Sequence, residues 1–297
     1  MKNTKPKVRL WSVLTGLTAI LTVAAIVGNI IANQYATTLN VALNASTYKI
    51  IHGENTGDTE YFKKGFASDE EREAYEAELC ATVEAEGAAL LKNENNALPL
   101  ASGAKVSLFG HGSVDLMYGG TGSGSVDTSK APNLKQALEA QGITINQTLW
   151  DLYSSDSMMS KYSRLTPASI SDTLEANTQY AVNEAPWSAL SSAESSFAEY
   201  GDAAIVVLSR SGGEGADLPS GENGTSDSWI SGQEGDGNYL ALSAEEIELL
   251  QNLKALKDNG TFKNIVVLIN SSNAIELDFL NPEICGEDYG IDAAMWI

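Results

Sequence analysis

Apolar and polar positions follow three different patterns along the chain. Near the N-terminus, residues 10–32 form one apolar run without a charge. Residues 33–67 are polar and rich in Thr and Asn, with no strong period. From residue 68 onward, short apolar runs of strand length alternate with stretches in which apolar residues recur at helical spacing. The pattern therefore predicts an apolar helix, a connecting segment and a mixed α/β domain.

The expected elements of this domain alternate along the chain. Strands are expected at 105–110, 143–149, 203–210, 264–270 and 290–297, and "AAIVVLSR" (203–210) gives the strongest signal. Helices are expected at 68–91, 131–142 and 242–260, and in pieces broken by Pro167 and Pro186 over 166–198. Continuous apolar strands separated by amphipathic helices indicate a mostly parallel sheet covered by helices on both faces.

Capping signals support three of the expected helices. Side chains that can cap a helix start, and glycines that can end one, occur at Ser68 with Glu71, Asn133, Ser243 with Glu246, Gly142 and Gly260. The apolar face expected for the first of these helices consists of Tyr75, Leu79, Cys80 and Val83.

The apolar run at 10–32 is long enough to cross a hydrocarbon core of about 30 Å as a helix. Four basic residues precede it: Lys2, Lys5, Lys7 and Arg9. Basic residues on this flank favour a cytoplasmic N-terminus, with the rest of the chain outside the cell. A cleaved signal peptide is the alternative, but its apolar region is usually about 7–15 residues and ends in a small-residue cleavage site. We therefore expect a single-pass anchor in the cell membrane.

The expected organisation is a basic tail (1–9), a transmembrane helix (10–32), a juxtamembrane segment (33–67) and one α/β domain (68–297). A formal net charge of −21 argues against nucleic acid as a partner, because phosphate binding requires clustered Lys and Arg. Two cysteines and two histidines provide neither a disulfide framework nor a zinc-site spacing. We expect no metal and no cofactor.

Ligands of parallel sheets bind beyond the carboxyl ends of the strands, so the loops after Phe109, Arg210 and Asn270 are the places to look. One of these loops sets Glu214 among three glycines. A loop glutamate that reaches into a cleft can have its pKa raised by partial burial, as a general acid requires. Other acids of the same loop leave the choice open: Asp217, Glu222, Asp227, Glu234 and Asp236.

Two other chemistries fit the loops poorly. The glycine-rich stretch "FGHGSVDLMYGGTGSG" follows a strand, but Asp115 interrupts the dinucleotide-binding pattern, and no P-loop motif occurs. Serine catalysis lacks the G-x-S-x-G turn and a suitably placed histidine.

Several segments together resemble the α/β sandwich domain of glycoside hydrolase family 3. They are "EGAALLKNENNALPL" (86–100), "KVSLFG", "GGTGSG" (119–124), "SRSGGEGADL", "EGDGNYLALSAEEIELLQNL", "IVVLINSSNAIELDFL" and "IDAAMWI". They follow the family's order and cover about residues 70–297. The resemblance implies a β-glucosidase-like, retaining glycosidase that acts on glycosides through a covalent glycosyl–enzyme intermediate.

In many members of this family, the glutamate of the S-G-E-G loop is the general acid/base, which corresponds to Glu214 here. The resemblance also implies that Ser123 of "GGTGSG" lines the cleft. Two departures affect the register of the loop: an extra glycine in "SGGEG", and "EGDGN" where many relatives have a basic residue. Glu222 and Glu234 are therefore the alternatives to Glu214.

The family's nucleophile is an aspartate of a separate (β/α)8 barrel, for which the anchor and the short segment before residue 68 leave no room. We expect a protein in which the sandwich comes first and the barrel second, with the sandwich incomplete at residue 297 and the fragment inactive by itself. The alternative function is a non-catalytic carbohydrate-binding or scaffold module on the cell surface.

Overall fold

The computed structural model describes residues 5–43, 64–120, 122–124, 126–166, 180–214 and 239–297. The chain divides into two units, Met1–Asp69 and Glu70–Ile297. The first unit contains helices α1 (Lys5–Gln34) and α2 (Ala36–Ala42). Within α1, Leu10–Gln34 is long and apolar enough to cross a membrane, and none of it is buried in protein. This helix is a signal sequence or an anchor by length and composition.

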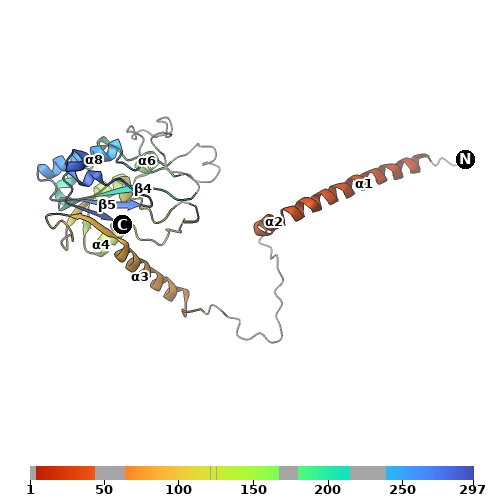
Figure 1. Ribbon diagram of the computed structural model, residues 1–297, viewed down its shortest axis with the longest axis horizontal. Helices are drawn as coiled ribbons and strands as arrows, with labels where there is room; N and C mark the ends of the chain where they lie inside the picture. Colours follow the sequence, from red (N-terminus) through yellow and green to blue (C-terminus); the bar gives the residue numbers. More distant parts are fainter. Residues whose placement is uncertain (1–4, 44–63, 121, 125, 167–179, 215–238) are drawn as a thin grey trace. The chain divides into compact units, whose positions relative to one another are not determined.

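The second unit is built on a six-stranded sheet (Figure 1). Its strands are β1 (Ala89–Asn93), β2 (Lys105–Phe109), β3 (Thr144–Ile145), β4 (Ala203–Arg210), β5 (Ile265–Ser271) and β6 (Ala293–Trp296). Their spatial order is β1-β6-β5-β4-β2-β3, and only the β1–β6 pair is antiparallel. The mostly parallel sheet predicted from the sequence is confirmed.

The helices of this unit are mostly short. They are α3 (Asp69–Gly87), α4 (Leu134–Ala140), α5 (Gln147–Tyr153), α6 (Asp156–Tyr162), α8 (Ala244–Asp258) and α9 (Pro282–Cys285). Asn133 caps α4 and Ser243 caps α8, each in a reciprocal capping box with the residue three positions on. These caps confirm the predicted starts of both helices.

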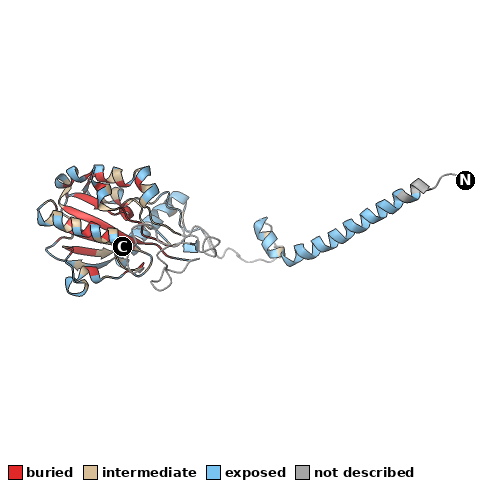
Figure 2. Cartoon of the chain, turned by 90° about the horizontal axis from the view of Figure 1, so that it is seen from above, coloured by how far each residue is buried: buried red, intermediate tan, exposed pale blue. Residues whose placement is uncertain are grey.

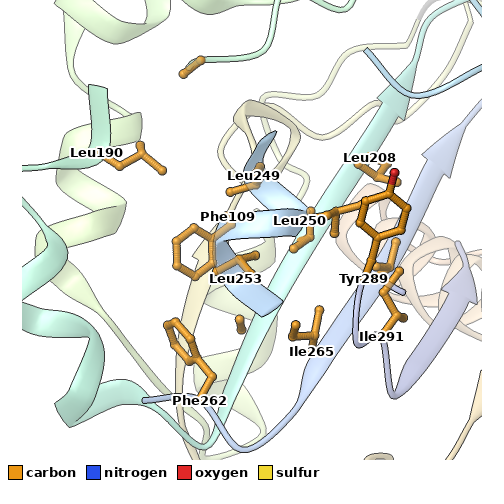
Figure 3. Close-up of a cluster of buried hydrophobic side chains, with 14 of the residues drawn as sticks. Phe109, Leu190, Leu208, Leu249, Leu250, Leu253, Phe262, Ile265, Tyr289 and Ile291 are labelled. Atoms are coloured by element: carbon orange, nitrogen blue, oxygen red, sulfur yellow. The ribbon is translucent and has the colours of Figure 1, made fainter. Parts of the chain in front are cut away.

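Alternate residues of the central strands enter two different clusters, one on each face of the sheet. Val206 and Leu208 of β4 join the larger cluster, to which α8 contributes Leu249, Leu250 and Leu253. Figure 3 shows these leucines beside Phe109 and Phe262. Ile205 and Val207 join the smaller cluster, which includes Leu134 at the start of α4. Figure 2 shows that burial is concentrated in the strands. The period of two in β4 places side chains on both faces, and both faces are buried.

The first predicted helix is too long. Helix α3 ends at Gly87, and the residues that follow form β1, which pairs with β6 at the far end of the chain. None of the described residues of α3 is buried, and its expected core positions Leu79 and Val83 are 46% and 62% exposed. A helical period predicts a helix, but it cannot show whether another element covers its apolar face.

The strand predicted at 143–149 is confirmed only at Thr144–Ile145. Asn146 ends it: its side chain accepts from the backbone N of Leu149 at 3.2 Å and caps α5. In the segment predicted to be helical over 166–198, 3-10 helices form at Trp187–Leu190 and Glu194–Tyr200. The prediction is wrong for the described residues 180–186, which are not helical and in which Ala181 forms a β-bridge with Leu165. Residues 167–179 of that segment lie outside the described residues.

Candidate functional site

The loops after β2, β4 and β5 meet at the carboxyl edge of the sheet, because these strands are parallel neighbours. The side chain of Asn270, near the end of β5, binds both backbone polar groups of Met117 in the loop after β2. Its Oδ1 accepts from the Met117 backbone N at 2.6 Å, and its Nδ2 donates to the Met117 carbonyl at 3.0 Å. Ser272 then links the third loop to the second by donating to the Gly212 carbonyl at 3.1 Å. The three loops form one connected surface.

Glu214 and Ser123, the two site residues predicted from the sequence, are in direct contact on this surface. The backbone N–H of Ser123 donates to Oε2 of Glu214 at 2.7 Å. Ser123 lies in a single 3-10 turn, Gly122–Gly124. A Cβ at Gly122 would lie 2.5 Å from the Cβ of Glu214, and Gly122 has a φ of +71°. The glutamate therefore requires a glycine on the opposite loop.

The electrostatics of Glu214 differ from the expectation of a raised pKa. Its carboxylate is exposed, and the hydrogen bond from the Ser123 backbone holds its pKa below the ordinary value. A hydrogen bond that favours the charged form has this effect, whereas a general acid needs the opposite shift. In this arrangement Glu214 is an ionised carboxylate. To donate a proton, it would have to lose this hydrogen bond or become buried.

A cavity of about 430 Å³ opens beside these loops. Its described lining comes mainly from residues 114–120, with Arg164 and Ser211 on other sides, and does not include Glu214. Arg164 pairs with Asp115 at 3.2 Å, so the acid that interrupts the dinucleotide-binding pattern is neutralised by a neighbouring segment. Tyr118 contributes an aromatic ring to the lining and is 41% exposed. Charged, hydroxyl-bearing and apolar side chains all line the cavity.

A buried ion pair fixes the base of the Glu214 loop, and sequence reasoning missed it. Arg210, the last residue of β4, donates from both terminal nitrogens to the two carboxylate oxygens of Glu246, each at 2.7 Å. Its Nε also donates to the carbonyl of Tyr239, where the described chain resumes. Burial is the largest single influence and by itself lowers the pKa of Arg210, but the charge and hydrogen bonds of Glu246, together with smaller effects of Tyr239 and Glu184, raise it overall. The guanidinium thus ties the two ends of the loop together.

A second buried contact, also missed, lies at the turn after β2. Oε2 of Glu184 accepts from the backbone N and from Nδ1 of His111, both at 2.9 Å. Nε2 of His111 is buried and has no hydrogen-bond partner among the described residues. The pair ties residues 180–185 to the loop after β2, and its two members are too far apart in sequence for spacing to reveal it.

The described residues contain no cluster of three or more His, Cys, Asp or Glu side chains that could hold a metal ion. Cys80 and Cys285 are free thiols. The alternative acids of the loop, among them Glu222 and Glu234, lie outside the described residues.

Comparison with known proteins identifies the second unit. Residues 88–296 match the family described as "Glycosyl hydrolase family 3 C-terminal domain". Beta-glucosidase A of Butyrivibrio fibrisolvens is 34% identical over 146 residues, which is 47% of this chain and 15% of that protein.

Solved structures agree. A beta-glucosidase from Paenibacillus barengoltzii superposes with a TM-score of 0.54 at 25% identity, covering 74% of this chain and 21% of that one. Beta-glucosidase 3B from Thermotoga neapolitana, solved in complex with glucose, gives 0.54 at 23% identity, with coverages of 76% and 27%. At 23% identity, the likeness to the Thermotoga neapolitana structure shows the fold alone. The chain thus spans less than a third of the length of each of these relatives.

Proposed function

The chain belongs to glycosyl hydrolase family 3, and from this premise we propose that it is the acid/base-bearing part of a retaining, exo-acting, β-glucosidase-like enzyme. Glu214 would protonate the glycosidic oxygen as the bond breaks and then take a proton from the attacking water. The observation that carries the proposal is the placement of Glu214. It projects from the carboxyl edge of the sheet and touches the glycine-rich loop of the neighbouring strand.

The nucleophile would be an aspartate of a (β/α)8 barrel encoded beyond this chain. Docking of a barrel against the carboxyl edge would remove water from Glu214. Desolvation raises the pKa of a carboxyl group and opposes the effect of the Ser123 amide. The exposed, ionised Glu214 of this structure is thus consistent with an enzyme whose acid is tuned only when the second domain closes over it.

The first experiment is to sequence the gene past the codon for Ile297 and express the whole reading frame. In that protein, Glu214→Gln should slow hydrolysis of alkyl glycosides by roughly 10²–10⁴-fold, and of activated aryl glycosides far less, because only poor leaving groups need a proton. Glu139→Gln, at an exposed position of α4, is the matched control and should change neither rate.

Equal losses on both substrate classes would contradict the assigned role of Glu214. A reading frame without a barrel, combined with sugar binding that survives Glu214→Gln, would instead favour the carbohydrate-binding module.

We further propose that α1 is an uncleaved anchor, with the N-terminus in the cytoplasm and the sandwich domain outside the cell. The supporting observations are its uncharged apolar segment and the basic residues that precede it.

A further inference from the structure

Asn273, two residues beyond β5, packs against the start of the loop that carries Glu214. Its Nδ2 donates to the carbonyl of Ser211. Its carboxamide also occupies the space beside Gly212, so that a Cβ at Gly212 would overlap all three of its terminal atoms. Gly212 does not have a left-handed φ. The glycine is therefore required by the close approach of Asn273 and not by backbone strain.

The orientation of Asn273 is set by the end of β5. Oγ of Ser271 donates to the Asn273 carbonyl at 2.8 Å and accepts from its backbone N at 3.1 Å. Ser271 is the last residue of a strand that pairs with β4 on one side and β6 on the other. The backbone of Asn273 is thus anchored to the edge of the sheet.

Other hydrogen bonds also reach the segment from Ser211 to Glu214. The hydroxyl of Tyr239 donates to the same Ser211 carbonyl at 3.0 Å, and Ser272 donates to the next carbonyl along. Each of these bonds holds one carbonyl oxygen of the segment. In addition to its hydrogen bond, the Asn273 carboxamide packs tightly against Gly212. The combination of a hydrogen bond and a filled space fixes both the position and the direction of the chain.

We propose that Asn273 is a positioning residue for Glu214: by holding Ser211 and Gly212 it aims the glutamate at the Ser123 turn. This inference rests on the proposed function for its catalytic meaning, but the geometry it asserts can be measured without turnover. It also explains why position 212 of "SGGEG" is a glycine, because a Cβ there would overlap the Asn273 carboxamide.

The experiment follows the Ser123 amide by NMR in the full chain, held in detergent micelles and labelled with ¹⁵N-serine. Ser123→Ala identifies the resonance. In the unaltered chain this amide should titrate at acid pH together with Glu214, and Glu214→Gln should abolish the titration. Asn273→Ala and Asn273→Asp should also abolish it, since neither provides the donor to Ser211. Asn264→Ala removes an asparagine carboxamide just before β5 and should leave the titration intact.

A complementary variant leaves Asn273 untouched. Gly212→Ala should displace the loop, abolish the titration and lower the Tm. Adding Asn273→Ala should restore much of the Tm, because the new methyl group then has room, but not the titration.

A Ser123 amide that still follows Glu214 in folded Asn273→Ala, or in Gly212→Ala, overturns the proposal. So does the lack of any titration in the unaltered chain. If the Asn273 variants fail to fold, Gly212→Ala decides alone. Should the NMR results hold while Glu214→Gln shows no leaving-group dependence, the positioning role stands and the proposed function falls.

Discussion

Arg210 can be buried as a charged residue because both carboxylate oxygens of Glu246 accept hydrogen bonds from its guanidinium. The two side chains are 0% and 2% exposed. Glu246 also completes the capping box of α8, because its Oε2 accepts from the backbone N of Ser243. One buried pair therefore joins the end of β4, the base of the Glu214 loop and the start of α8.

Arg210→Met should lower the free energy of unfolding by about 3–5 kcal/mol, because it leaves the charge of Glu246 buried without a partner. Denaturation of the full chain by urea measures the change. Combining Arg210→Met with Glu246→Leu should recover most of the loss, since no unpaired charge then remains. A double variant as unstable as the sum of the two single ones would show that the pair acts only through its separate contacts.

The lowered pKa of Asp202, just before β4, predicts how the stability of the fold depends on pH. Its carboxylate accepts from the backbone N of Lys105 at 2.8 Å and from the ammonium of Lys263. The Lys105 backbone, followed by Lys263, lowers the pKa of Asp202 below 3.8. An acid whose pKa is lowered on folding stabilises the fold at pH values above its pKa in the unfolded chain. For Asp202 this stabilisation is lost as the pH falls from about 3.8 through its lower pKa in the folded protein.

Asp202→Asn should therefore reduce the urea midpoint at pH 7 and have less effect at pH 3, where the native aspartate has begun to lose its advantage. Because this carboxylate is partly exposed, the difference should be small. The opposite trend, with a larger effect at pH 3, would contradict the assignment.

At the scale of whole elements, α3 and α8 have similar lengths but opposite environments. Helix α8 buries Leu249, Leu250 and Leu253 in the larger cluster (Figure 3). Helix α3 buries none of its described residues. Helix α8 is thus held by packing, whereas α3 relies on its own backbone and surface pairs such as Arg72 with Glu76.

Leu250→Ala should accordingly lower the free energy of unfolding by about 2–5 kcal/mol, the usual cost of a cavity in a closed core. Leu79→Ala, the same substitution on α3, should cost no more than about 0.5 kcal/mol. Urea unfolding of both variants, monitored by circular dichroism, provides the comparison. A large cost for Leu79→Ala would mean that another surface covers this face in solution.

At the scale of the whole molecule, the apolar helix α1 predicts whether the chain associates with membranes. If α1 is an uncleaved anchor, the chain should sediment with membranes, and the same chain without residues 10–32 should stay in the supernatant. N-terminal sequencing of the native protein distinguishes the alternatives. A mature N-terminus beyond residue 32, with all protein in the supernatant, would identify a cleaved signal sequence.

The sequence by itself determined the features whose causes are local. Strand β4 was predicted with its observed bounds, because a short continuous apolar run with the β-branched residues Ile205, Val206 and Val207 at its centre is typical of a buried strand. The caps at Asn133 and Ser243 could be predicted for the same reason, because each side chain accepts a hydrogen bond from the backbone N three residues further along the chain. Burial of both sheet faces followed from the continuous apolar strands.

Only the tertiary structure decided the rest. Residues 89–93 form a strand because β6, near the other end of the chain, provides its hydrogen bonds. Ser123 meets Glu214 across 91 residues, and Asn273 meets Ser211 across 62, because parallel pairing brings their loops to the same edge. Local spacing identified Glu214 as a candidate. The lowered pKa of Glu214 and its aim toward Ser123 depend on contacts that exist only once the sheet has fixed which loops are neighbours.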